Sequence, residues 1–151
     1  MFTFPQSFQK PSLPSGFILE RQSPPSSQSL NRLLFTCNEE TFPPRKLALA
    51  IKSSTYYLSI LEKERQKLVG FVRATSDKGL NANLWNLVAE PGNYQDRLLA
   101  VLVHRILETI KQEMPGCSIS ISASPIAIVS LKQQGFLIDP AGIRAMGLKL
   151  R

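Results

Sequence analysis

The chain has 151 residues, of which 43% are hydrophobic and 19% are charged. This composition excludes a disordered chain and is typical of one globular domain with a buried core. Eighteen Lys and Arg residues against eleven Asp and Glu give a net charge of +7. The charge favours an anionic partner, such as a phosphorylated cofactor, an acidic protein, nucleic acid or an anionic membrane surface. The basic residues form no continuous tract, which argues against nucleic acid.

The sequence predicts no metal site. His104 is the single histidine, and Cys37 and Cys117 lie far apart, without the spacing of zinc ligands. Two isolated cysteines indicate buried, reduced side chains and hence a cytosolic type of compartment. The first residues lack a basic region followed by an apolar one, and no run of residues is long and apolar enough to span a bilayer. We therefore expect a protein that is soluble or peripheral to a membrane.

Residues 1–16 contain three prolines and a glycine, which favour an extended arm before a domain at 17–151. One interpretation of this arm is a disordered terminus. The other is a segment that binds a groove of a protein partner, because aromatic side chains on extended backbone suit such docking. The side chains predicted to bind the partner are Phe2, Phe4 and Phe8.

Hydrophobic periodicity and turn residues predict the elements of the domain in chain order. The first part gives strand 17–21, a helix capped by Ser27 or Ser29, a helix that begins at Pro43-Pro44, and strands 55–62, 67–75 and 82–89. The second part gives helix 95–113, strand 117–123, a short helix 125–134 ended by Gly135, and strands 136–138 and 144–150. This order predicts an α/β fold with one mixed sheet of six to seven strands and about four helices on both faces.

Three stretches resemble one enzyme family. Residues 68–77 (LVGFVRATSD), 81–86 (NANLWN) and 135–146 (GFLIDPAGIRAM), in this order of elements, are similar to the GNAT superfamily of acetyl-coenzyme A dependent N-acetyltransferases. The resemblance covers residues 17–151 and is strongest to the cyanobacterial and chloroplast branch related to plastid nuclear-shuttle-interacting and serotonin N-acetyltransferases. It implies acetyl-coenzyme A as cofactor, and the cytoplasm of a cyanobacterium or the chloroplast stroma as location. A position peripheral to the thylakoid membrane, through a membrane complex, is a further expectation.

The resemblance implies that the cofactor binds at the end of strand 82–89 and at the turn that opens helix 95–113. In the family, pyrophosphate lies against backbone amides of a Gln/Arg-x-x-Gly-x-Gly/Ala turn, where the helix dipole attracts phosphate. Leu98 occupies the first glycine position, so its side chain is expected to crowd the phosphate path. Asp96 adds an unfavourable negative charge there. The cofactor-binding candidates are Leu87, Val88, Ala89, Gln95, Arg97, Leu98 and Ala100.

At two positions, the residues that serve proton transfer in the family are replaced in this sequence. Leu131 stands where the family often has a tyrosine that protonates the departing thiolate. Asn86 stands where this branch tends to have Asp, and an amide cannot be a general base, although a water or Glu90 could replace it. Tyr56 and Tyr57 are candidates to replace the missing acid and should point to opposite faces of their strand. Trp85 is expected in the core, and His104 on the surface with Glu108 as partner.

These observations lead to three hypotheses. The first is a GNAT-fold module with lost or reduced catalysis that binds a protein partner, in a photosynthetic complex for example. The second is an active N-acetyltransferase that acts on an amine or a lysine. The third is a basic nucleic-acid-binding module, which predicts retention on DNA or RNA that depends strongly on salt.

Overall fold

The computed structural model describes residues 10–150. Their centre is a five-stranded sheet in the order β1-β2-β3-β4-β5. Strands β1 to β4 are antiparallel to their neighbours, whereas β5 is parallel to β4. The strands are β1 (Phe17–Glu20), β2 (Tyr56–Glu62), β3 (Lys67–Ser76), β4 (Asn81–Ala89) and β5 (Ser118–Ile121). The predicted α/β class with one mixed sheet is confirmed.

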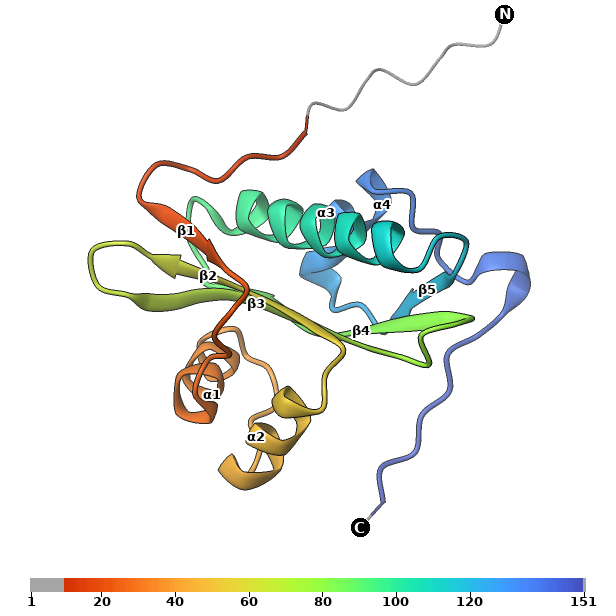
Figure 1. Cartoon of the computed structure of the whole chain (residues 1–151), viewed down its shortest axis with the longest axis horizontal. Helices are drawn as coiled ribbons and strands as arrows, with labels where there is room; N and C mark the ends of the chain where they lie inside the picture. The colour runs from red at the N-terminus through yellow and green to blue at the C-terminus, as the bar shows by residue number, and fades with distance from the viewer. Residues whose placement is uncertain (1–9, 151) are drawn as a thin grey trace, which may run out of the picture.

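Helices cover both faces of the sheet, as predicted (Figure 1). One face carries α3 (Gln95–Glu113) and the short α4 (Ile128–Gln133). A 3-10 turn, η1 (Pro125–Ala127), lies directly before α4. The other face carries α1 (Ser27–Thr36) and α2 (Pro44–Lys52). The cap of α1 is Ser26 rather than the predicted Ser27 or Ser29, and its hydroxyl accepts a hydrogen bond from the amide of Ser29. Pro44 begins α2 because its missing N–H is not needed in the first turn.

The two faces of the sheet enclose two separate cores. The larger core lies under α3, whose buried side chains meet those of alternate positions on β2, β3 and β4. The smaller core lies under α1 and α2 and includes Phe71 of β3 and Val88 of β4. Tyr56 packs against the larger core and Tyr57 against the smaller one, so the two tyrosines point to opposite faces, as predicted.

The predicted strands 136–138 and 144–150 are absent from the sheet, which has five strands rather than six to seven. Gly135 ends α4 with φ +94°, as predicted, but the chain then passes through η2 (Pro140–Gly142) and continues without a strand partner. The apolar side chains of this segment are exposed, Met146 by 96% and Leu148 by 87%. Apolar residues alternate along this segment, but a strand also needs a neighbour to accept its hydrogen bonds.

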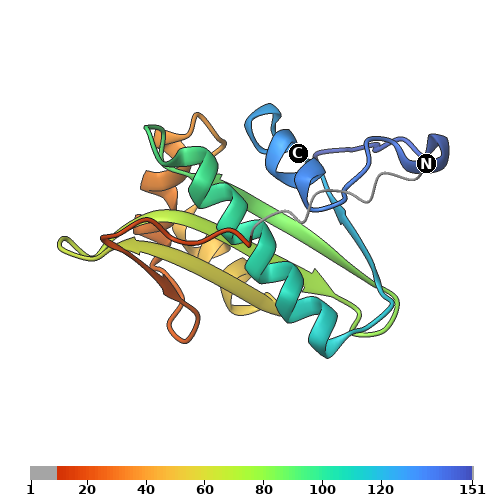
Figure 2. The same ribbon diagram turned by 90° about the horizontal axis from the view of Figure 1, so that it is seen from above.

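The segment 10–16 lies against α3 (Figure 2). Leu13 packs on the larger core, and Arg97 Nε donates a hydrogen bond of 3.0 Å to the carbonyl of Ser12. Lys10 Nζ lies 2.9 Å from Glu108 Oε1. The predicted partner residues Phe2, Phe4 and Phe8 lie outside the described residues.

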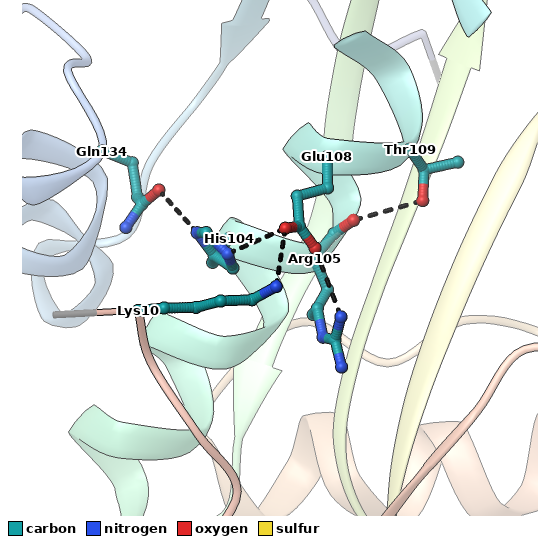
Figure 3. Close-up of polar contacts among 6 residues, drawn as sticks. All are labelled: Lys10, His104, Arg105, Glu108, Thr109 and Gln134. Carbon is teal, nitrogen blue, oxygen red and sulfur yellow. Dashed lines mark hydrogen bonds and ion pairs between the residues drawn. The ribbon is translucent and has the colours of Figure 1, made fainter. Parts of the chain in front are cut away.

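A polar cluster around Glu108 joins this segment to α3 and α4 (Figure 3). The Glu108 carboxylate lies 3.2 Å from His104 Nε2 and 3.3 Å from Arg105 Nη1. His104 Nδ1 lies 3.3 Å from Gln134 Oε1, just after α4. The predicted pairing of His104 with Glu108 is confirmed, but its side chain is only 20% exposed because α4 covers it.

Candidate functional site

Strands β4 and β5 separate toward the carboxyl end of β4. Their pairing extends from Asn81 and Ser118 to Leu84 and Ile121 and ends there. The register between β3 and β4 shifts by one residue between the pairs Phe71–Val88 and Arg73–Trp85. Asn86 lies in this bulge with a left-handed backbone, φ +53°. Beyond Leu84, β4 continues to Ala89 without a paired residue of β5, so the sheet is open on this side.

A pocket of about 270 Å³ lies at this opening. The end of β4 forms its floor, the start of α3 one side, the α1–α2 connection a second side, and the segment before α4 a third. The lining residues are Cys37, Asn38, Glu39, Leu87, Val88, Ala89, Pro91, Gln95, Ser124 and Ile126. Four segments that are distant in the sequence therefore meet at this pocket.

The start of α3 presents free hydrogen-bond donors. Tyr94 is its N-cap residue and makes no side-chain capping bond. Within residues 10–150, the amides of Asp96 and Arg97 have no acceptor, whereas the Leu98 amide donates to the Tyr94 carbonyl. Unpaired amides and the positive end of a helix dipole attract phosphate. This end of α3 is therefore suited to hold an anionic group.

Two polar side chains of the lining, those of Ser124 and Gln95, differ in their hydrogen bonding. The Ser124 hydroxyl is buried and has no hydrogen-bond partner among the described residues. Such a group costs free energy unless something pairs with it. Gln95 Nε2 donates a bond of 2.9 Å to the Ala89 carbonyl, which ties the start of α3 to the end of β4. A hydroxyl, free amides and an apolar floor fit a ligand that carries both a phosphate group and an apolar part.

The structure brings four of the predicted cofactor-binding residues together, since Leu87, Val88, Ala89 and Gln95 all line the pocket. Arg97 does not line it, because its guanidinium binds Ser12 on the outer side of α3. Ala100 also lies outside the lining. This division follows the helix period, which turns successive side chains to different sides of α3.

The expectation that the Leu98 side chain crowds the phosphate path is wrong. Leu98 is 2% exposed and belongs to the core between α3 and the sheet. In the GNAT resemblance this position is a glycine, but α3 here begins at Gln95 and turns Leu98 inward. Leu131 is likewise buried, with 3% exposure, in the same core. Both leucines are therefore packing residues in this fold.

None of the predicted catalytic candidates lines the pocket, and each has a partner elsewhere. Glu90 Oε1 lies 2.6 Å from Lys67 Nζ. Tyr56 Oη donates a 2.5 Å bond to Glu113, which raises the pKa of Tyr56 to about 12. Tyr57 Oη donates to the Gln22 carbonyl at 3.1 Å, and Asn86 Oδ1 accepts from Arg73 Nε at 2.8 Å.

Cys37, Asn38 and Glu39 form one wall of the pocket that was not predicted from the sequence. Asn38 adopts φ +56° after α1, and the Glu39 amide bonds to the Leu34 carbonyl, so the chain reverses and brings Glu39 to the pocket. The sequence signal for this chain reversal was Asn38, because asparagine often adopts the left-handed conformation that ends a helix. Burial raises the pKa of the Cys37 thiol to about 11, and its Sγ contacts the Ala89 carbonyl at 3.2 Å. Cys37 is thus a packing residue and not a nucleophile.

Two further findings concern the part of the chain that the structure describes. It contains no group of three or more His, Cys, Asp or Glu side chains that could hold a metal ion. It also contains no helix of the length and apolar character that a membrane crossing requires.

Known proteins resemble this chain in sequence and in fold. An "uncharacterized N-acetyltransferase ycf52" of Pyropia yezoensis is 35% identical over 106 residues, which are 69% of this chain and 60% of that protein. "GCN5-related N-acetyltransferase 1, chloroplastic" of Arabidopsis thaliana is 28% identical over 134 residues, 87% of this chain and 66% of that protein. The chain thus spans less than two thirds of the length of these relatives. No protein-family model matches it.

Among solved structures, a probable acetyltransferase from methicillin-resistant Staphylococcus aureus superposes with a TM-score of 0.79. The superposition covers 89% of this chain and 99% of the other, at 15% sequence identity. It shows a common fold. Together with the relatives, it confirms the family resemblance that the sequence predicted.

Proposed function

We propose that this homologue of the GCN5-related N-acetyltransferases, which has the GNAT fold, binds acetyl-coenzyme A at the end of β4 and transfers the acetyl group to an amine. The observation that carries the proposal is the pocket between β4, α3 and Ser124, with unpaired amides at the start of α3. When bound, acetyl-coenzyme A supplies an activated thioester. The acceptor nitrogen gains the acetyl group and loses a proton, and coenzyme A leaves as the thiol.

The chain's own groups have distinct tasks in this proposal. The amides of Asp96 and Arg97 hold the pyrophosphate, and the Ser124 hydroxyl pairs with a polar group of the cofactor. The apolar floor of Leu87, Val88 and Ala89 contacts the extended arm of the cofactor. Glu39 is the single acidic side chain in the lining, so we assign to it the proton that the amine loses.

The binding part of the proposal is tested by calorimetry with acetyl-coenzyme A. We expect the unchanged chain to bind it and Ser124→Phe to lose binding, because the larger side chain fills the pocket. Ser122→Phe is the matched control, since Ser122 is exposed and does not line the pocket. Equal binding by both variants, or no binding by the unchanged chain, contradicts this site.

The catalytic part is tested by release of the free thiol in the presence of amines. We expect Glu39→Gln to lower kcat by about a hundredfold, within the usual range for loss of a general base. Its affinity for acetyl-coenzyme A should stay the same. Glu40→Gln is the control, because Glu40 does not line the pocket and pairs with Lys149. An unchanged kcat in Glu39→Gln refutes the role of Glu39.

One observation favours a second candidate function, a module that binds acetyl-coenzyme A or a protein partner with lost or reduced catalysis. Glu90, Tyr56, Tyr57 and Asn86 are all engaged by other groups and lie outside the pocket lining. Cofactor binding without thiol release, over a broad set of amines, would support this candidate. In this candidate function, the N-terminal arm binds the protein partner, within a photosynthetic complex for example. Co-purification of a partner with the full chain, and with a chain that lacks residues 1–9, tests this role.

We also propose a location in the chloroplast stroma or in the cytoplasm of a cyanobacterium. The proposal is supported by the name of the chloroplastic relative from Arabidopsis thaliana. Association with the thylakoid membrane stays a prediction, and fractionation of the source cells tests it.

A further inference from the structure

One part of the sheet on the side of α1 and α2 is not covered by these helices. The smaller core uses Phe71 of β3 and Val88 of β4, and Arg73 lies two positions beyond Phe71 on the same face, beside Tyr57 of β2, which packs against this core. Trp85 is paired with Arg73 across the strands and is 43% exposed, so the expectation that it lies in the core is wrong. We call the surface formed by Arg73, Thr75, Asn83, Trp85 and Asn86 the open sheet face.

The side chains of this face hold one another in place. Arg73 Nε donates a 2.8 Å hydrogen bond to Asn86 Oδ1, and its guanidinium carbon lies 5.8 Å from the centre of the Trp85 ring. Trp85 Nε1 donates a 2.8 Å bond to Thr75 Oγ1. The guanidinium is thus fixed between an amide and an indole, with its geometry set before any ligand arrives.

Among the described residues, no carboxylate pairs with the Arg73 charge. No ion pair within residues 10–150 includes Arg73, although its side chain is half-buried and burial lowers its pKa. A half-buried cation without a counter-charge is unfavourable unless a ligand pairs with it. The planar fork of Arg binds carboxylate and phosphate groups with two parallel hydrogen bonds.

The backbone joins this face to the proposed cofactor pocket. Asn86 has the left-handed φ of +53° and is followed directly by Leu87 and Val88 of the pocket floor. A non-glycine residue in this conformation costs free energy and is often retained at functional sites. The strained residue therefore lies between the pocket and the Arg73 guanidinium and fixes their relative position.

From these observations we infer that the open sheet face is the acceptor subsite, and that Arg73 selects amines that also carry an anionic group, a carboxylate or a phosphate. Trp85 contacts the carbon skeleton of the acceptor, while Asn86 orients Arg73. The inference rests on the proposed acetyl transfer, since it names the substrate class of that reaction. Amines without an anionic group lack a partner for the guanidinium and bind less well.

Trp85 is the single tryptophan of the chain, so its fluorescence reports binding at this face without any turnover. The titration uses the full chain saturated with coenzyme A and two pairs of amines that differ in one anionic group. One pair is L-lysine and cadaverine, and the other is glucosamine 6-phosphate and glucosamine. We expect the anionic member of at least one pair to bind about tenfold more tightly, the effect of one charge-assisted hydrogen bond. The pair that shows the effect identifies the carboxylate or the phosphate.

Arg73→Met should remove this discrimination, and Arg73→Lys should retain part of it, because an ammonium keeps the charge but loses the fork. Arg105→Met is the control, since Arg105 lies on α3 and pairs with Glu108. Thermal unfolding checks that each variant is folded. If Arg73→Met is not folded, Arg73→Lys carries the test, and undiminished discrimination in that variant overturns the inference. Equal affinities within both pairs, or discrimination that survives both Arg73 substitutions, overturns the inference. Loss of acetyl-coenzyme A binding in calorimetry would instead contradict the proposed function.

Discussion

Tyr56 Oη donates a 2.5 Å hydrogen bond to Glu113 Oε2, and this bond links the first residue of β2 to the last residue of α3. The two residues are far apart in the sequence, so the bond forms only when α3 lies across the sheet. Its main consequence is chemical, because a phenol that donates to a carboxylate resists ionisation.

The pKa of Tyr56 should be visible in an alkaline titration. The bond to Glu113 raises this pKa to about 12, above the ordinary value near 10. The chain has three tyrosines, so absorbance at 295 nm should show one late phase, which Tyr56→Phe removes. The raised pKa of Tyr56 stabilises the folded state, and this contribution is complete below pH 10 and is lost as the pH rises through 12. A Tyr57→Phe variant is the control, and it should keep the late phase.

Glu108 should make the attachment of the N-terminal segment sensitive to acid. Lys10, then Arg105 and His104, hold the pKa of this carboxyl at about 2, below its ordinary value of 4.5. A lowered pKa stabilises the folded state above pH 4.5, and this contribution is lost as pH falls toward 2. Glu108→Gln should increase hydrogen exchange and proteolysis at residues 10–16 at neutral pH. Glu40→Gln, after α1 and paired with Lys149, should leave exchange there unchanged. Unaltered exchange in Glu108→Gln would contradict the role of the cluster.

Leu98→Gly should destabilise the protein rather than restore a family-like cofactor loop. The substitution removes a side chain that is 2% exposed and places glycine in the first turn of α3. We expect the free energy of unfolding to fall by about 3–5 kcal/mol, as for other large-to-small core changes. Chemical denaturation measures it. Asp96→Gly, at an exposed position of the same turn, should cost about 1 kcal/mol or less.

Removal of the Asp96 charge should strengthen cofactor binding. The exposed Asp96 carboxylate lies in the first turn of α3, beside the amides that we assign to the pyrophosphate. Asp96→Asn keeps the shape of the side chain and removes a repulsion, so the Kd for acetyl-coenzyme A should fall about two- to fivefold at low salt, with less change at high salt. Glu113→Gln, at the other end of α3, is the control. A weaker affinity of Asp96→Asn would argue against pyrophosphate at this helix end.

Gly70 allows α3 to approach the sheet closely. A Cβ at this position would lie 3.2 Å from Leu102 Cδ1 and 3.3 Å from the Ile60 side chain. Gly70→Val should therefore lower the free energy of unfolding by about 1–3 kcal/mol through overpacking. Gly79→Val is the matched control, because a Cβ there meets nothing nearer than 3.9 Å. Thermal or urea unfolding compares the two, and equal stability would show that α3 shifts without cost.

The sequence by itself determined the elements whose signals are local. Helix 95–113 follows from apolar side chains at helical spacing, and the structure has the same bounds. Strands β2, β3 and β4, the proline start of α2 and the glycine stop of α4 follow from alternation and turn residues. The GNAT resemblance also came from short strings of sequence, and the relatives and the fold confirm it.

Only the tertiary structure decided where individual side chains point and which segments meet. Leu98 was expected at the ligand but lies in the core, because the rotation of α3 is fixed by the sheet beneath it. Trp85 was expected in the core but is exposed, since α1 and α2 cover another part of the sheet. Residues 144–150 alternate like a strand yet have no partner in the sheet. Periodicity reports which side chains share a face, whereas the neighbour of that face is set by contacts between segments far apart in the chain.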